Sequence, residues 1–441
     1  MNGTPKGHVK VHVLQTVDSA KDPKVALADR TTYDVGAVYG GGNNADYRPT
    51  STTEFAEVII DGCEKTSIKY VFGGGNAAAT PANEVKINGC YIIDNVYGGG
   101  NGTVSPANVG YDEAAIGDTP AYKTLGTAKT NLSGGYVHNV YGGSNNQGNI
   151  LGGASVTNEK YTGEGCCETL QVQEIYGGGK KADMFGGAEI VLGCMPDDWI
   201  GAIYAGAENA DVGGDVGLTL TSGKFERVFG GNKSGGKIDG YIEVNIEENP
   251  ECGTPIIIGE LYGGGNEAPY TYPLLDKDPN YLSPRVNVRA FTSIGTIYGG
   301  GLGKTATVKG NPLVNINEVA GGRGYAGETR TLEDGTKVTL YERKTDGKMG
   351  VIGTVFGGGN AAKVIGTTYV NVATEAEQKM ESLKTMDATG KVTEVKRSVV
   401  GADIRGNVYG GGNAADVTGG TNVTIGEKKV TTAPTTTPTN P

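Results

Sequence analysis

The chain has 441 residues, of which 76 are glycine, and a net charge of −11. Glycine is far above its ordinary share of about 7%, but no Gly-X-Y period is present, which excludes collagen. Lysine and arginine form no cluster, which argues against a nucleic-acid partner. No apolar stretch reaches the roughly 18 residues that indicate a membrane-spanning helix, so we expect no membrane insertion.

The N-terminal segment has the pattern of a β-strand. Val9, Val11 and Val13 alternate with polar residues in HVKVHVLQT, and a period of two indicates a half-buried strand. We expect residues 1–37 to form an opening coil or cap. The segment lacks the charged and apolar regions of a signal peptide, and we expect an exported protein from which the signal has been removed.

From residue 38 onward, one short phrase returns eleven times: an aliphatic residue, then Tyr or Phe, then a glycine-rich turn. Self-similarity of this kind predicts stacked structural coils with insertions at tolerated places. The aromatic residues are Tyr39, Phe72, Tyr97, Tyr141, Tyr176, Tyr204, Phe229, Tyr262, Tyr298, Phe356 and Tyr409. An asparagine stands four positions later in seven coils, at Asn43, Asn76, Asn101, Asn145, Asn266, Asn360 and Asn413.

Short alternating runs lie between these phrases, as at Val216, Leu218 and Leu220. Such runs, bounded by Gly, Asn and Pro, indicate two or three short strands in each coil. A single coil cannot bury its apolar face, whereas stacked coils share a continuous core. The sequence therefore predicts an all-β parallel β-solenoid over residues 38–428, with about eleven coils and a length of roughly 50 Å at the spacing of neighbouring strands.

Each recurrent position should form a column along the solenoid. The aliphatic column from Val38 to Val408 is expected in the core. The asparagines are expected in turns of left-handed backbone, with their amides hydrogen-bonded along the stack. The aromatic column points the other way from the aliphatic one, and we interpret it as a structural ladder. The alternative is a platform for stacking sugar rings, which would use Tyr39, Tyr97, Tyr141, Tyr176, Tyr204, Tyr262, Tyr298 and Tyr409.

One glycine turn resembles a phosphate-binding loop. Gly303, Lys304 and Thr305 supply the Gly-Lys-Thr ending, but Tyr298 stands where the first glycine of that motif belongs. The same turn recurs without a lysine in other coils. We therefore expect a repeated structural turn and no nucleotide or other cofactor.

The cysteines form a pattern of their own. Five of the six lie seven to ten residues before an aromatic residue, which places Cys63, Cys90, Cys167, Cys194 and Cys252 near one corner of the solenoid. Cys63 and Cys90 fall in successive coils, whose spacing of about 4.8 Å suits a disulfide. A column of buried free thiols is an equally good interpretation.

Acidic residues supply the remaining chemical candidates. Asp183 shares one coil with Lys180 and Lys181, and Glu208 and Asp211 lie in the next coil. Stacked carboxylates either stay solvated, bind a cation or act in catalysis. We interpret the group mainly as a solvated face, with a metal site formed by Asp183, Glu208 and Asp211 as the alternative.

The insertions are the segments in which the coils differ from one another. They cover residues 102–135, 268–284, 317–350 and 373–403, and ATEAEQKMESLK from residue 373 has a helical pattern. Insertions project from the edge of a solenoid, where binding surfaces usually lie. We expect any partner to be bound there.

The tail TTAPTTTPTNP is a Thr/Pro-rich sequence typical of an extended linker, assigned to residues 429–441. The V-[YF]-G-G-G-N repeats, the V-x-V strands and this tail together resemble the glycine-rich β-helical repeat regions of bacterial cell-surface, adhesin-like proteins. The resemblance implies a non-enzymatic structural or adhesive module, flanked by further domains, with an unidentified host protein or glycan as its partner. A polysaccharide-binding or polysaccharide-cleaving β-helix is the alternative.

Overall fold

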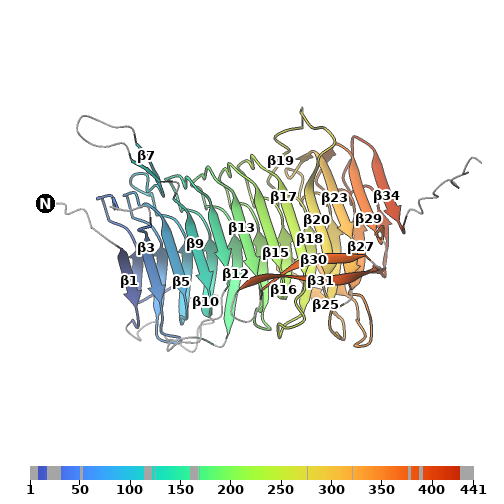
Figure 1. The fold of residues 1–441 in the computed structure, drawn as a ribbon, viewed down its shortest axis with the longest axis horizontal. Helices are drawn as coiled ribbons and strands as arrows, with labels where there is room; N and C mark the ends of the chain where they lie inside the picture. The colour runs from blue at the N-terminus through green and yellow to red at the C-terminus, as the bar shows by residue number, and fades with distance from the viewer. Residues whose placement is uncertain are drawn as a thin grey trace, which may run out of the picture.

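The computed structural model describes residues 8–16, 31–49, 53–113, 122–124, 126–158, 167, 169–275, 277–319, 321–375, 379–386 and 391–427. Within these residues every regular element is a β-strand, and the strands stack into a rod from β1 to β34 (Figure 1). The predicted all-β parallel solenoid is confirmed. The Thr/Pro-rich residues 429–441 lie outside the described part of the chain.

Two long parallel sheets form the rod, and the chain alternates between them. Sheet A contains β1 (Val9–Val13), β3 (Ala56–Ile60), β5 (Asn83–Ile87), β9 (Ala128–Leu132), β11 (Ala154–Thr157), β13 (Ala188–Leu192), β15 (Val216–Leu220), β17 (Ile242–Glu247), β20 (Leu282–Ala290), β23 (Asn311–Ile316), β29 (Thr368–Val372) and β34 (Thr421–Ile425). Sheet B contains β2 (Val35–Tyr39), β4 (Ser67–Phe72), β6 (Ile92–Tyr97), β10 (Gly135–Tyr141), β12 (Leu170–Tyr176), β14 (Trp199–Tyr204), β16 (Gly223–Phe229), β18 (Ile256–Tyr262), β21 (Ser293–Tyr298), β27 (Val351–Phe356), β32 (Asp403–Ile404) and β33 (Val408–Tyr409).

A third, shorter parallel ladder closes each coil. It consists of single bridges such as Ile150 to Met184 and Met184 to Val212. Towards the C-terminus it widens into three two-residue strands, β19 (Tyr270–Thr271), β22 (Val308–Lys309) and β28 (Val364–Ile365). Side chains from all three ladders fill one continuous apolar core. Because all coils share this core, the low apolar content of the chain is enough to fill it.

The register places equivalent residues of successive coils opposite one another. Val228 pairs with Ile203 on one side and Leu261 on the other, and all three are fully buried. The aliphatic column therefore lies in the core, as predicted. The Asn column is also present, because Asn76, Asn101 and Asn145 each donate an amide hydrogen bond to the asparagine of the preceding coil at 2.7 Å.

The expected left-handed backbone at the asparagines is wrong by one residue. Positive φ occurs at the following position, at Gly102, Glu267, Ala361 and Ala414. The asparagine itself keeps an ordinary φ, with its amide in line with its neighbours, and the next residue has the positive φ in four of the seven coils. Only Gly102 takes this conformation without steric cost.

The insertions are also β-structure. They form the hairpins β7–β8 (Tyr111–Glu113, Tyr122–Thr124), β25–β26 (Glu328–Thr331, Lys337–Leu340) and β30–β31 (Met380–Met386, Val392–Gly401), with β24 (Glu318–Val319) pairing β31. The helix expected from residue 373 is wrong where the chain is described, since Met380–Met386 is a strand. Leu383 packs with Val399, Val319 and Ala290 in a small apolar cluster, so tertiary packing overrides local helix propensity. Figure 1 shows β30–β31 running along the rod, across the strands of the solenoid.

The cysteines form two disulfides, but not between successive coils. Cys63 pairs with Cys167 and Cys194 with Cys252, with Cα–Cα distances of 5.2 and 4.5 Å. The suggested pairing of Cys63 with Cys90 is wrong, because the Cys90 thiol is free and buried in the core cluster. Cys167 instead passes over Gly134, whose missing side chain leaves room for it. Disulfides indicate an oxidising environment.

Candidate functional site

The aromatic column forms an unbroken stack of eleven rings along the outer side of sheet B. Neighbouring centroids lie 4.6 to 5.0 Å apart with interplanar angles of 4 to 12°. Tyr97, Tyr141, Tyr176, Tyr204, Tyr262 and Tyr298 are all buried. Both faces of every interior ring are covered by other rings, which leaves no open face for a sugar. Tyr39 and Tyr409 end the stack, and Tyr409 is 44% exposed.

The tyrosine hydroxyls are used within the protein. Tyr141 donates to Glu208, and Tyr204 and Tyr262 accept from the amides of Asn266 and Asn360 at 3.4 and 3.3 Å. Burial raises the pKa of these hydroxyls, in Tyr298 to about 12. The ladder is therefore a neutral structural element whose hydroxyl groups hydrogen-bond to polar residues.

The proposed metal ligands do not converge. Asp183 accepts a hydrogen bond from the backbone N–H of Asp211, and Asp211 accepts one from that of Lys237, both at 2.8 Å. Glu208 is engaged by Tyr141. Among the described residues, no group of three His, Cys, Asp or Glu side chains could hold a metal ion. The aspartates instead link each coil to the next.

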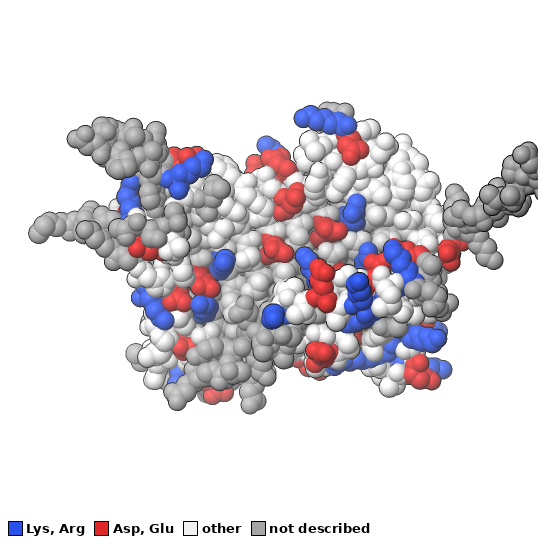
Figure 2. All heavy atoms as spheres, viewed as in Figure 1, with Lys and Arg blue, Asp and Glu red and all other residues white. Residues whose placement is uncertain are grey.

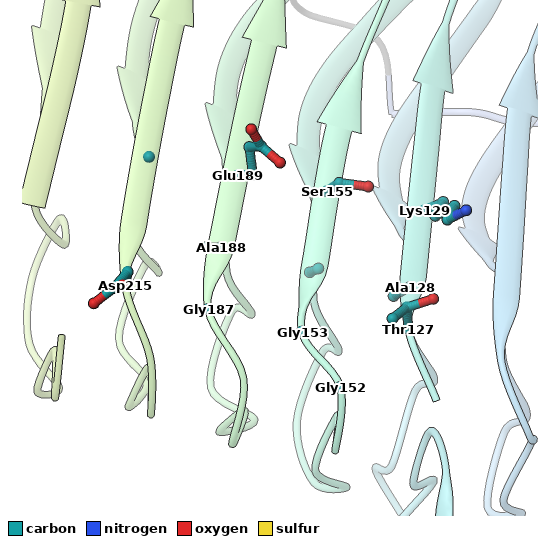
Figure 3. A pocket seen from close by; sticks show the side chains of 12 residues that line it. Thr127, Ala128, Lys129, Gly152, Gly153, Ser155, Gly187, Ala188, Glu189 and Asp215 are labelled. Carbon is teal, nitrogen blue, oxygen red and sulfur yellow. The ribbon is translucent and has the colours of Figure 1, made fainter. Parts of the chain in front are cut away.

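Two larger hollows on the surface of the described residues are considered, and the first lies on sheet A. This groove of about 410 Å³ crosses β9, β11, β13 and β15. Figure 3 shows glycines and alanines along its floor, with Lys129 at one end and Glu189 and Asp215 towards the other. The hollow exists because the glycines and alanines lack bulk, and its polar side chains are spread along the groove, as Figure 3 shows. We do not consider it a recognition site.

The second hollow, which we call the hairpin cleft, has about 780 Å³ and lies between sheet B and hairpin β25–β26. Its wall on the solenoid comes from β12, β14 and β16, and its opposite wall from β25 and the turn that follows. The lining includes Glu174, Trp199, Tyr204, Glu226, Arg227, Lys233, Asn266, Arg330, Thr331 and Glu333. It is the one place where an edge insertion, an indole and several charged side chains meet in the described chain.

Glycines in sheet B anchor the hairpin. A Cβ on Gly295 would lie 2.1 Å from Val338, and one on Gly259 would lie 3.4 Å from Leu332. Val338 and Leu332 are buried against the sheet. Because glycine leaves the outer face of β18 and β21 open, the hairpin packs directly on the solenoid, and the wall of the cleft is held in place.

The cationic side chains in the cleft are paired with carboxylates. Arg227 contacts Glu260 at 2.8 Å and Asp334 at 2.7 Å, while Arg330 contacts Glu226 at 2.6 Å. Burial opposes the charge on Arg227, but the hydrogen bonds and attraction of Glu260 and Asp334 outweigh it and raise its pKa. These pairs join β16 and β18 to the hairpin and keep its charged groups in fixed positions.

An aromatic and a lysine complete the site. The guanidinium of Arg330 lies 3.8 Å from the centroid of the Trp199 ring, a cation–π contact. Lys233 contacts Glu174 at 2.7 Å and donates to the Tyr176 hydroxyl at 2.9 Å. The cleft thus combines a tryptophan, hydroxyl and amide groups, ion pairs and the carboxylate of Glu333.

The sequence pointed to part of this site. It identified the insertion at residues 317–350 as a binding edge and named Tyr204, but it missed Trp199, Arg227, Lys233 and Arg330. Two signals in the sequence could have identified these residues. Trp199 is the single tryptophan of the chain. Gly259 and Gly295 each stand three residues before an aromatic of the ladder, and the hairpin packs on these two glycines.

No protein-family model, curated protein or solved structure matches the chain. The described residues contain no helix long and apolar enough to cross a membrane. On the face drawn in Figure 2, acidic and basic side chains are interspersed over the coils.

Proposed function

We propose that this chain is a non-enzymatic module of an exported cell-surface protein that binds a glycan in the hairpin cleft. The observation that carries the proposal is the composition of the cleft: Trp199, with Arg330 over its ring, stands among ion-paired and amide side chains between a rigid sheet and an edge insertion. The resemblance to adhesin-like repeat regions points to the same class of function.

The chemistry of the walls favours a hydroxylated, uncharged ligand. Each sugar hydroxyl both donates and accepts hydrogen bonds, and the cleft offers acceptors at Glu174 and Glu226 beside donors at Lys233 and Arg330. A strongly charged ligand would have to displace an existing ion pair. The volume of about 780 Å³ lies within the usual range for ligand sites.

Two of the three glutamates that line the cleft have cationic partners, which favours binding over cleavage. Glu226 is held by Arg330, and Glu174 by Lys233. A glycosidase needs one carboxyl group that is protonated as an acid and a second one free as base or nucleophile. A pair held in place by cations suits recognition better.

The two disulfides support an extracellular location, because they form and persist in oxidising compartments. The solenoid then acts as a rigid, protease-resistant spacer that presents the cleft at its side.

A glycan array tests the proposal, with the wild-type chain, Trp199→Ala and Phe185→Ala compared at equal concentration. Phe185 is a large, 59% exposed side chain outside the cleft, so its variant controls for loss of surface hydrophobicity. We expect Trp199→Ala to bind the retained glycans at least tenfold more weakly and Phe185→Ala to bind like the wild type.

Two results would contradict the proposal. Equal loss in both variants would place recognition outside the cleft. New reducing or unsaturated ends after incubation with the bound glycan would show an enzyme.

A further inference from the structure

A smaller pocket lies beside the sheet A groove, where the insertion at residues 268–284 meets β17 and β20. This pocket, which we call the tyrosine pocket, has about 140 Å³ and is lined by Asp215, Val216, Gly217, Tyr241, Ile242, Glu243, Tyr281, Leu282 and Arg285. None of these residues lines the hairpin cleft. The pocket shares Asp215 and Gly217 with the groove, and Figure 3 shows Asp215 at that end of the groove. A second insertion thus builds a hollow on the other long sheet of the rod.

The insertion brings a cluster of tyrosine rings to this pocket. Tyr281 stacks on Tyr241 with 4.4 Å between the ring centroids, and on Tyr272 with 5.3 Å between them. Tyr272 is buried, whereas Tyr241 and Tyr281 are partly buried and line the pocket. The buried ring therefore holds the other two in place. Aromatic side chains with a few polar groups beside them are the usual lining of a small-ligand site.

Arg285 brings an unused hydrogen-bond donor to the pocket. Its guanidinium carbon lies 5.6 Å from the centroid of the Tyr281 ring, and its Nε is buried without a hydrogen-bond partner. Glu243 lies opposite Arg285 in the register of β17 and β20, but this carboxylate accepts a hydrogen bond from the Asn287 amide at 3.1 Å. Buried N–H groups are nearly always paired in folded proteins. An unpaired one in the wall of a pocket indicates that a ligand supplies the acceptor.

Two exposed carboxylates, those of Asp215 and Glu243, line the same pocket. Asp215 accepts a hydrogen bond from the backbone N–H of Tyr241 at 2.9 Å through one oxygen, and its second oxygen can accept from a ligand. The charges converge on the Tyr281 hydroxyl: burial raises its pKa, Arg285 opposes the shift, and Tyr241, Glu243 and Asp215 add to it. The pocket therefore presents acceptors and a donor on either side of one ring.

This combination of groups selects among classes of ligand. An anion would be repelled by Asp215 and Glu243, and a cation by Arg285. A sugar hydroxyl both donates and accepts hydrogen bonds, so one hydroxyl can donate to a carboxylate while its neighbour accepts from Arg285. The C–H face of the sugar ring can pack on a tyrosine. The volume of about 140 Å³ is below the roughly 300–1,000 Å³ of drug-sized sites, which limits the pocket to about one sugar unit.

We propose that the tyrosine pocket is a second glycan-binding site, which takes one neutral sugar unit, with the adjoining groove as room for the rest of the same glycan. The inference rests on the proposed function for the class of ligand, but it uses different residues on a different sheet. A rod with one site on each long sheet can hold two glycan chains, or two parts of one chain at high effective concentration.

Saturation-transfer NMR on the full chain tests the proposal, with the methyl glycosides of glucose, galactose, mannose and glucuronic acid as separate probes. Trp199→Ala serves as the background, because it removes the indole of the hairpin cleft and leaves the tyrosine pocket intact. In that background we expect a neutral methyl glycoside to bind, and Arg285→Gln to weaken its binding at least fivefold. Asp215→Asn should also weaken binding, since it keeps an acceptor for the Tyr241 N–H and removes the charge that attracts a hydroxyl.

Arg405→Gln is the matched control. The Arg405 side chain is 54% exposed and lies outside both sites, so its loss removes a guanidinium without touching either ligand. Binding in the Trp199→Ala background should not change. Equal melting temperatures of the variants establish that each chain is folded.

The outcomes separate this site from the hairpin cleft. Equal binding by Trp199→Ala with and without Arg285→Gln would overturn the proposal. Loss of all binding in Trp199→Ala would also overturn it and would support the hairpin cleft alone. If Trp199→Ala binds like the wild type and Arg285→Gln does not bind, the tyrosine pocket stands and the hairpin cleft fails. Preference for the methyl glucuronide over every neutral probe would refute the assignment of a neutral ligand, and a wild type that binds no probe would refute the site.

Discussion

Replacing Tyr262 by alanine tests the aromatic ladder as a source of stability. The ring is fully buried and stacks on Phe229 at 4.8 Å and on Tyr298 at 4.7 Å. Truncation of a buried large aromatic costs about 3–5 kcal/mol, and two stacked faces place Tyr262 towards the upper end of that range. We expect the variant to lose this amount of unfolding free energy.

Two companion variants separate the contributions. Tyr262→Phe keeps the ring and removes only the hydroxyl that accepts from Asn360 at 3.3 Å, so it should cost about 1 kcal/mol. Tyr409→Ala removes a ring with one stacked neighbour and 44% exposure, and it should cost roughly 1–2 kcal/mol.

Urea unfolding followed by circular dichroism, at a concentration where single chains predominate, measures all three variants. The reasoning fails if Tyr262→Ala and Tyr409→Ala lose the same free energy, because stability would then not depend on stacking from both sides. It also fails if Tyr262→Phe is as damaging as Tyr262→Ala.

Two further predictions concern the thiols and pH. Removing the Cys194–Cys252 disulfide by a double Ser substitution should destabilise the fold by roughly 4 kcal/mol, a value that follows from the 58-residue separation of the two cysteines. In the native chain, the buried Cys90 thiol should not react with maleimide until the chain unfolds. Rapid labelling of Cys90 would contradict its position in the core. Burial raises the pKa of Glu247 to about 7; the Lys384 N–H, Arg289 and the Lys384 side chain oppose this shift, and Glu243 adds to it. The folded chain therefore holds a proton that the unfolded chain releases at lower pH. The resulting contribution to stability is fully present below about pH 4.5 and is lost as pH rises through about 7. The protection factors of the amides in hairpin β30–β31, which correct for the base-catalysed rise of intrinsic exchange, should accordingly fall between about pH 4.5 and pH 7 in the wild type but not in Glu247→Gln. An equal fall in both chains would assign the change to another group.

The coils could be predicted from the sequence because the same residue types recur at the same positions of each coil, where steric constraints require them. The glycine two residues after each aromatic and the aliphatic residue before it have one role in every coil, and the asparagine after it has one role in the seven coils that contain it. The columns could therefore be assigned to core, turn and ladder, and the structure confirms these assignments apart from the one-residue shift of the left-handed position.

Features that occur only once could not be predicted in the same way. Cys63 reaches Cys167 because the segment before β12 returns across Gly134, and spacing along the chain does not contain that path. Met380–Met386 forms a strand because Leu383 packs with Ala290 and Val319 from distant segments and with Val399 of its own hairpin. The hairpin cleft joins residues 174 to 333, so its members become neighbours only once the coils and the hairpin have packed.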